Sequence, residues 1–316
     1  MKFKPLDLKK IRTYSVKKRR SKVSLSKKAA IYKGGCSFKE FLCTLPGILA
    51  ASDLKAVVAA MARAHRDKRT IALGMGAHVI KTGLSPLIIE LMERGIVNAV
   101  ATNGACIIHD FELAYLGQTS EDVDKELRSG MFGMARETGE LLNNAIGRGV
   151  KKGYGLGKAV GEFILNSKFP NKDVSIFAAA ERLNVPITVH VALGTDIIHA
   201  HPSMNGSLTG EGSMRDFKIF SSVVQALSKG VFLNIGSAVL IPEVFLKALT
   251  LSRNIGGGEK AVKDFTTVDM DFVRHYRPMM NVVKRPTAGS GKGYALIGHH
   301  EIMLPLLFAA LIEELA

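Results

Sequence analysis

Short runs of apolar and β-branched residues, each followed by small or polar residues, recur along the chain. Four such runs, at residues 70–73, 96–101, 187–193 and 231–233, predict buried strands. Segments with helical periodicity lie between them, so strands and helices alternate. This order predicts an α/β fold, namely a doubly wound, mostly parallel sheet with helices on both faces.

Helices are predicted where apolar residues recur every three or four positions. These intervals are residues 52–67, 83–94, 107–116, 173–183, 216–227, 242–253 and 302–315. Two further short strands are expected at residues 266–270 and 281–284. The glycine- and serine-rich residues 203–213 predict a long loop, of the kind that forms a lid over a site. Residues 285–294 predict a second glycine-rich loop.

The positive charge is concentrated at the amino terminus. Residues 1–34 hold 13 Lys and Arg and one acidic residue, Asp7, and so carry +12 of the net charge of +15. One interpretation is a tail that binds nucleic acid, anionic lipid or an acidic partner. The other is a solvated arm that becomes ordered only on a neighbouring subunit.

We expect the rest of the chain, residues 35–316, to form a single α/β domain. Residues 118–168 are polar and rich in predicted helices, at 121–127, 132–146 and 156–165. A doubly wound sheet does not need these helices. We therefore interpret this segment as a helical insertion or a subunit-contact region.

Composition predicts a well-buried globular protein in a reducing compartment. Hydrophobic residues make up 47% of the chain, yet no apolar run approaches the 18 residues of a membrane-spanning helix. The basic amino terminus lacks the apolar segment of a secretory signal. The three cysteines have no CxxC spacing, so neither a disulfide framework nor a thiolate zinc site is indicated. We expect a cytoplasmic protein.

Polar and small residues follow each predicted strand. They are Gly74 and Gly76; Thr102, Asn103 and Gly104; Asp196, His199 and His201; and Gly236 and Ser237. Parallel strands end at one edge of a sheet, where open α/β sheets bind ligands. The pattern therefore predicts one pocket, to which His109-Asp110 and His299-His300-Glu301 add further groups for proton transfer.

Two glycine motifs resemble phosphate-binding signatures only in part. Gly74-x-Gly76 lacks the third glycine of the dinucleotide fingerprint, because Val79 stands in its place. Gly289-Ser-Gly-Lys292 lacks both the first glycine and the final Ser or Thr of a P-loop, so an NTPase is excluded. The pair His199-x-His201 leaves open a metal-dependent hydrolase or lyase, although no motif of metal-binding spacing occurs.

Several stretches together resemble the deoxyhypusine synthase family. They are GMGAHVIKTG, VNAVATNGACIIHDFELAYLG, VPITVHVALGTD, MRDFKIFSSVVQALSKGVFLNIGSAVLIPEVFLKAL, VVKRPT and HHEIMLPLLFAAL, which resembles the family's terminal helix. The resemblance covers most of residues 70–310. It implies a NAD-binding, doubly wound α/β enzyme that acts on an amine or amino acid, by transfer or related chemistry. It also implies a homotetramer with active sites at subunit interfaces, with residues 203–213 near a neighbouring chain.

The resemblance also implies roles for the residues at the strand ends. The expected cofactor-binding residues are Gly74, Gly76, Thr102, Asn103, Gly104, Asp196, Gly236 and Ser237. The expected acid–base and substrate-binding residues are His109, Asp110, His199, His201, His299, His300 and Glu301. No resident metal is assigned.

The chain departs from the family at its catalytic lysine. The family carries that lysine just after the penultimate glycine-rich strand end, and residues 235–241 here contain none. Lys284 and Lys292 are the nearest substitutes. Without a lysine the family's covalent imine cannot form in the usual way. A third hypothesis remains, namely a non-catalytic ligand-binding protein whose basic tail binds nucleic acid.

Overall fold

The computed structural model describes residues 3–257 and 261–316 and contains one six-stranded sheet in the order β3-β2-β1-β4-β5-β6. Every neighbouring pair of strands is parallel. The strands are β1 (Ile71–Met75), β2 (Ala99–Asn103), β3 (Ile187–His190), β4 (Val231–Ile235), β5 (Thr266–Asp271) and β6 (Lys292–Ile297). Because the strand order reverses between β1 and β4, the sheet is doubly wound, and the predicted fold class is confirmed.

Helices cover both faces of the sheet. Successive residues of a strand point to opposite faces, so Phe232 packs on one side of β4 while Leu233 and Ile235 pack on the other. The first side packs against α10 (Gly206–Gln225) and α11 (Leu240–Gly256). The second side packs against α2 (Leu49–Arg66), α4 (Ser85–Glu93), α5 (Gly104–Leu116), α9 (Ile176–Arg182) and α13 (His300–Leu315). The continuous apolar strands predicted from the sequence are buried between these layers.

Three helices, α6 (Val123–Ser129), α7 (Arg136–Lys151) and α8 (Leu156–Leu165), occupy the segment predicted as a helical insertion. The shorter elements are α1 (Phe38–Thr44), α3 (His78–Lys81), α12 (Tyr276–Pro278), η1 (Leu8–Lys10), η2 (Val16–Lys18), η3 (Leu25–Lys27), η4 (Lys172–Val174) and η5 (Ile197–Ala200). No helix in residues 3–257 and 261–316 is long and apolar enough to cross a membrane.

The predicted loop at residues 203–213 is wrong, because most of it is helical. Helix α10 begins at Gly206, and the side chain of Asn205 accepts a hydrogen bond from the Leu208 backbone N–H at 3.0 Å. A β-carbon at Gly212 would lie 2.5 Å from the side chain of Leu156. The small residues that suggested a loop therefore allow α10 to pack closely against the insertion. No open lid exists at this position.

The predicted strand at residues 281–284 is also wrong. Residues Met279–Lys284 form a π-helical turn, labelled η7, and the last strand is β6, which begins inside the predicted glycine-rich loop. The Thr267 hydroxyl donates to the Val282 carbonyl at 2.7 Å. A β-carbon at Gly293 would lie 2.0 Å from the Val283 carbonyl oxygen. The apolar pair Val282-Val283 is thus buried as a helical turn against β5 and β6, a long-range contact that periodicity does not reveal.

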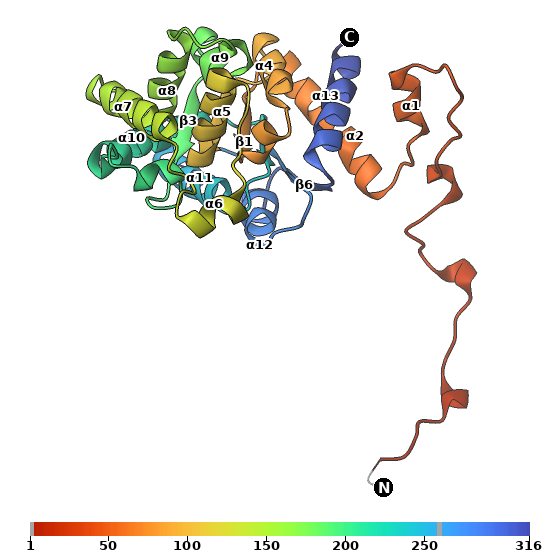
Figure 1. Cartoon of the computed structure of the whole chain (residues 1–316). Helices are drawn as coiled ribbons and strands as arrows, with labels where there is room; N and C mark the ends of the chain where they lie inside the picture. Colours follow the sequence, from red (N-terminus) through yellow and green to blue (C-terminus); the bar gives the residue numbers. More distant parts are fainter. Residues whose placement is uncertain (1–2, 258–260) are drawn as a thin grey trace.

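The basic amino-terminal segment is an exposed arm that leaves the helical body near α1 (Figure 1). Residues 1–2 lie outside the described residues, and residues 3–35 are all exposed. Two backbone hydrogen bonds hold the base of the arm, from Gly47 to the Lys27 carbonyl at 3.0 Å and from Ala30 to the Thr44 carbonyl at 2.9 Å.

Candidate functional site

A cavity of about 210 Å³ opens at the carboxyl ends of β2 and β3. Its charged and titratable lining residues come from several elements of the fold. They are Lys81 at the end of α3, His109 and Glu112 on α5, Glu121 before α6, and Asp196 after β3. Because three carboxylates face one lysine, the lining favours a ligand that carries positive charge.

His109 belongs to a chain of hydrogen bonds on one wall of this cavity. Its Nδ1 lies 2.6 Å from the Thr119 hydroxyl, which donates to Glu112 Oε2 at 2.6 Å. The Thr138 hydroxyl of α7 donates to the other oxygen of Glu112 at 3.0 Å. Burial, followed by the positive charge of Lys81, lowers the pKa of His109 to about 4. The imidazole is therefore neutral at pH 7.

Asp196 lies against the amino-terminal end of α5. A β-carbon at Gly104 would lie 2.1 Å from its Oδ2, so only glycine leaves room for this carboxylate. Burial raises the pKa of Asp196, while the neighbouring His199 and Thr195 lower it by less. Within the described residues Oδ2 has no hydrogen-bond partner. Asp196 thus lies at the cavity with one buried carboxylate oxygen that has no partner among the described residues.

The ring of His199 lies behind Asp196. Its Nδ1 accepts hydrogen bonds from the backbone N–H groups of Gly194 and Asp196, both at 3.2 Å, so the neutral ring carries its proton on Nε2. That nitrogen is 3.9 Å from Asp196 Oδ2 and has no partner among the described residues. Asp196, predicted to bind the cofactor, and His199, predicted to act in catalysis, thus lie close together, although not in direct hydrogen-bond contact.

Two of the predicted proton-transfer residues are engaged in structural contacts. Asp110 is buried at the start of α9, where its carboxylate accepts hydrogen bonds from the Ser175 hydroxyl and from the Ile176 and Phe177 backbone N–H groups. His201 Nδ1 lies 2.7 Å from the Ser203 hydroxyl. Asp110 therefore joins α5 to α9, and His201 fixes the turn before α10.

The predicted cofactor glycines mainly allow close packing. A β-carbon at Gly74 would lie 2.4 Å from Ile241 of α11, so this residue belongs to a packed sheet face. A β-carbon at Gly76 would lie 2.2 Å from the Gly236 carbonyl oxygen, which brings the loops after β1 and β4 into backbone contact. A β-carbon at Gly236 would lie 2.7 Å from the ring of His300. The loops after β1 and β4 are thus packed closely together at the point of strand reversal, and His300 lies against them.

The remaining predicted cofactor residues also have local partners. The buried Thr102 hydroxyl donates to the Thr188 carbonyl of β3 at 3.1 Å. Asn103 caps α5, since its side chain accepts the Cys106 backbone N–H at 3.3 Å. Ser237 Oγ accepts the Ile241 backbone N–H in the first turn of α11, also at 3.3 Å. Asn103 leads directly into the wall of the cavity through Gly104 and Ala105.

A second group of rings lies at the carboxyl ends of β1 and β5. The ring of His299 is nearly parallel to that of Phe272 at 6.1 Å, and the ring of His78 is 5.4 Å from His300. His300 Nε2 contacts the Met270 carbonyl at 3.2 Å, while its buried Nδ1 has no partner within the described chain. Glu301 is exposed, 3.9 Å from His299. The predicted residues His299 and His300 therefore belong to this group of rings and do not line the cavity that contains His109.

The sequence did not indicate Lys81 and Glu112, which line the cavity, or Thr119 and Thr138, which hydrogen-bond Glu112. One available signal was the spacing of three between His109 and Glu112, which places both on one face of a helix. The two threonines gave no such signal, because they reach Glu112 from the loop after α5 and from α7.

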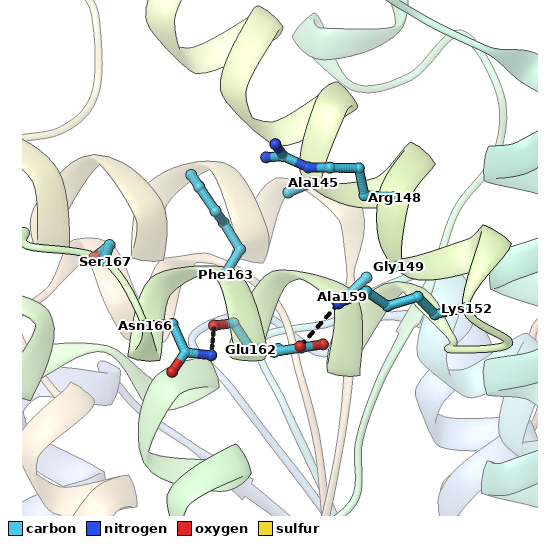
Figure 2. Close-up of a pocket in the computed structure, with 9 residues that line it drawn as sticks. All are labelled: Ala145, Arg148, Gly149, Lys152, Ala159, Glu162, Phe163, Asn166 and Ser167. Carbon is cyan, nitrogen blue, oxygen red and sulfur yellow. Dashed lines mark hydrogen bonds and ion pairs between the residues drawn. The ribbon is translucent and has the colours of Figure 1, made fainter.

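A second cavity, of about 240 Å³, lies between α7 and α8, away from the strand ends (Figure 2). Figure 2 shows Arg148 and Phe163 on its two sides, and Lys152 bonded to Glu162 at 3.1 Å. None of its polar side chains is among the buried atoms without partners. In residues 3–257 and 261–316, no three His, Cys, Asp or Glu side chains are placed to hold a metal ion together.

No protein-family model and no curated protein sequence matches this chain. Solved structures share its fold at low identity. A protein assigned as a deoxyhypusine synthase from Entamoeba histolytica is 14% identical, with a TM-score of 0.54 over 90% of this chain and 96% of that one. A LOR/SDH-type protein from Methanococcus maripaludis is 16% identical, with a TM-score of 0.53 over 84% of this chain and 70% of that one.

The same fold occurs within longer proteins. The cyanobacterial arginine dihydrolase ArgZ is 17% identical, with a TM-score of 0.51 over 84% of this chain. AgrE, solved in a ternary complex with ornithine and NAD+, is also 17% identical, with a TM-score of 0.51 over 85% of this chain. The chain spans only about a third of either protein, 33% of ArgZ and 34% of AgrE. These structural similarities show that the chain shares the fold of these proteins.

Proposed function

We propose that this chain is a NAD-binding enzyme that acts on an amine or amino-acid substrate. The observation that carries the proposal is the cavity beside β2 and β3, where a neutral His109 and a buried Asp196 flank a negatively charged lining. The deoxyhypusine synthase-like fold and the NAD+ complex of AgrE support the choice of cofactor.

The residues at the strand ends fit NAD. Asp196 Oδ2 is buried without a partner in the described chain, and a carboxylate at a strand end accepts ribose hydroxyls in nucleotide-binding sheets. The exposed rings of His78, Phe272 and His299 offer planar surfaces at the same edge of the sheet. Both features suit a ligand with hydroxyl groups and flat rings.

Oxidation at a carbon–nitrogen bond requires the substrate to lose a proton and a hydride. NAD+, when bound, supplies the hydride acceptor. His109 is neutral at pH 7 and lines the cavity, so it takes the proton. Glu112 and Glu121 favour entry of a positively charged amine, and Lys81 is placed to attract a carboxylate.

The cofactor assignment is tested by titrating the protein with NAD+ in a calorimeter. We expect saturable binding below millimolar concentration, which Asp196→Ala weakens at least about tenfold, a loss of about 1.4 kcal/mol. Asp124→Ala, on the exposed surface of α6, serves as the matched control and should bind as the native protein does. The assignment would be contradicted if no heat of binding were measured up to millimolar NAD+. It would also be contradicted if Asp196→Ala bound NAD+ as tightly as the native protein.

The oligomeric state of the chain is part of the same proposal. We propose a homotetramer, whose mass in light scattering should be about four times the 34.1 kDa of one chain. A mass equal to one chain, unchanged by dilution, would contradict it.

Deleting residues 1–26 is expected to leave the melting temperature of the domain unchanged, because no described residue of the arm is buried. The same deletion should remove any salt-sensitive binding of the arm to nucleic acid, since it takes away most of the arm's basic side chains. Binding is measured by electrophoretic mobility shift at low salt. If the truncated protein still shifted the nucleic acid as the native protein does, the binding would belong to the α/β domain instead of to the arm.

A further inference from the structure

His109 does not stand alone in the cavity, since its Nδ1 begins the hydrogen-bonded chain to Thr119 and Glu112. A threonine hydroxyl has one hydrogen to donate, and here it is donated to Glu112 Oε2 at 2.6 Å. The oxygen of Thr119 therefore acts as the acceptor toward the ring, 2.6 Å away. A neutral His109 in this arrangement must carry its proton on Nδ1.

This order of donors leaves the other ring nitrogen without a proton. His109 Nε2 has no hydrogen-bond partner among the described residues and is not among their buried unpartnered atoms, so it is accessible from the cavity. A nitrogen with an accessible lone pair can accept a proton from a ligand. The opposite tautomer would place a hydrogen there and could only donate.

Glu112 is itself held from two sides. Thr119 comes from the loop after α5, whereas Thr138 comes from α7 of the helical insertion and donates to Glu112 Oε1 at 3.0 Å. With both oxygens engaged as acceptors, the carboxylate cannot turn away from Thr119 without losing a bond. The insertion therefore contributes a contact that fixes the chain of hydrogen bonds.

We propose that Thr119 and Glu112 are positioning residues that hold His109 in the Nδ1–H tautomer, so that Nε2 faces the cavity as a proton acceptor. This inference rests on the proposed role of His109 in the function above. It adds two residues to that function and gives the helical insertion a part in it, through Thr138.

The proposal is tested by ¹H–¹⁵N NMR of the imidazole nitrogens in the full-length protein, with the His109 signals assigned by their loss in His109→Gln. We expect a protonated, pyrrole-type Nδ1 and an unprotonated, pyridine-type Nε2 at pH 7. Thr119→Val keeps the shape of the side chain but removes the acceptor, so the Nε2–H tautomer should become the major form. Thr119→Ser should restore the native pattern.

Glu112→Gln gives an independent check. The amide can donate to the Thr119 oxygen, which frees the threonine hydroxyl to donate to Nδ1 and shifts the ring toward Nε2–H. An unprotonated Nδ1 in the native protein, or native signals in both Thr119→Val and Glu112→Gln, would overturn the proposal. These spectra need no cofactor, so a failure of NAD+ binding would leave their result readable.

The same spectra can be followed as a function of pH. Lys81, Glu112, Glu121 and Asp196 all line the cavity with His109. The native ring should remain neutral well below pH 6.5, because burial and Lys81 disfavour the charged form. Lys81→Met should move the titration of His109 to higher pH, whereas Lys125→Met on exposed α6 should not. If native His109 took up its second proton at the pH at which an exposed histidine does, the proposal of a buried, neutral acceptor would be contradicted.

Discussion

Replacing Asp110 with alanine is expected to lower the free energy of unfolding by about 3–5 kcal/mol. The substitution leaves the Ser175 hydroxyl and the Ile176 and Phe177 backbone N–H groups without their acceptor at the buried start of α9. Each buried donor left without a partner costs about 1–3 kcal/mol. The loss is measured by urea unfolding of the native and variant proteins under identical conditions.

Two further variants make this result specific. Asp110→Asn keeps an oxygen acceptor and should cost less than the alanine variant. Asp122→Ala removes the exposed cap of α6, whose carboxylate accepts the Lys125 N–H at 3.3 Å, and should cost only about 1 kcal/mol. If Asp110→Ala were as stable as the native protein but failed to bind its ligand, Asp110 would belong to the site instead of to the joint between α5 and α9.

Gly104→Ala is expected to reduce NAD+ affinity at least about tenfold, or about 1.4 kcal/mol, with little loss of stability. The new β-carbon would overlap Asp196 Oδ2, and the carboxylate would have to leave the end of α5. Alanine also restricts the unfolded chain more than glycine does, by about 0.4–1 kcal/mol, which offsets part of the strain. Calorimetric titration with NAD+ and thermal melting measure the two quantities.

Gly210→Ala is the matched control for this variant. Gly210 also lies in a helix, α10, and a β-carbon there would have nothing within 4 Å. It should bind NAD+ with native affinity and melt at the same temperature or slightly higher. Native affinity in Gly104→Ala would show that the position of Asp196 does not matter for the cofactor.

Much of the fold follows from local pattern. The fully buried β1 and β4 were predictable because buried parallel strands are continuous apolar runs. Helix α8 was predicted at residues 156–165 and is found at Leu156–Leu165. The start of α10 was not predictable in this way, since glycines such as Gly212 are there for contact with another helix, a relation between distant segments.

In the candidate site, too, only the residues with a local sequence signal could be predicted. The sequence indicated His109 and Asp196, because polar residues next to strand ends stand out from their apolar surroundings, and both line the cavity. Adjacent residues of a helix point in different directions, however, so Asp110 faces α9 while His109 faces the cavity. Thr119 and Thr138 could not be recognised, because their importance depends on where Glu112 lies in three dimensions.

The connection between β2 and β3 has a consequence for the order of folding. Ala72 of β1 pairs with Ala99 of β2, but Val100 of β2 pairs with Ile187 of β3, about three times as far along the chain. Closing a longer loop costs more chain entropy before any contact compensates it, and non-local pairing is slow. The pairing of β1 with β4 joins residues still farther apart, since Ile71 pairs with Val231. We therefore expect β3 to pair with β2 before β4 pairs with β1, so that the cavity at β2 and β3 forms before the two halves of the sheet meet.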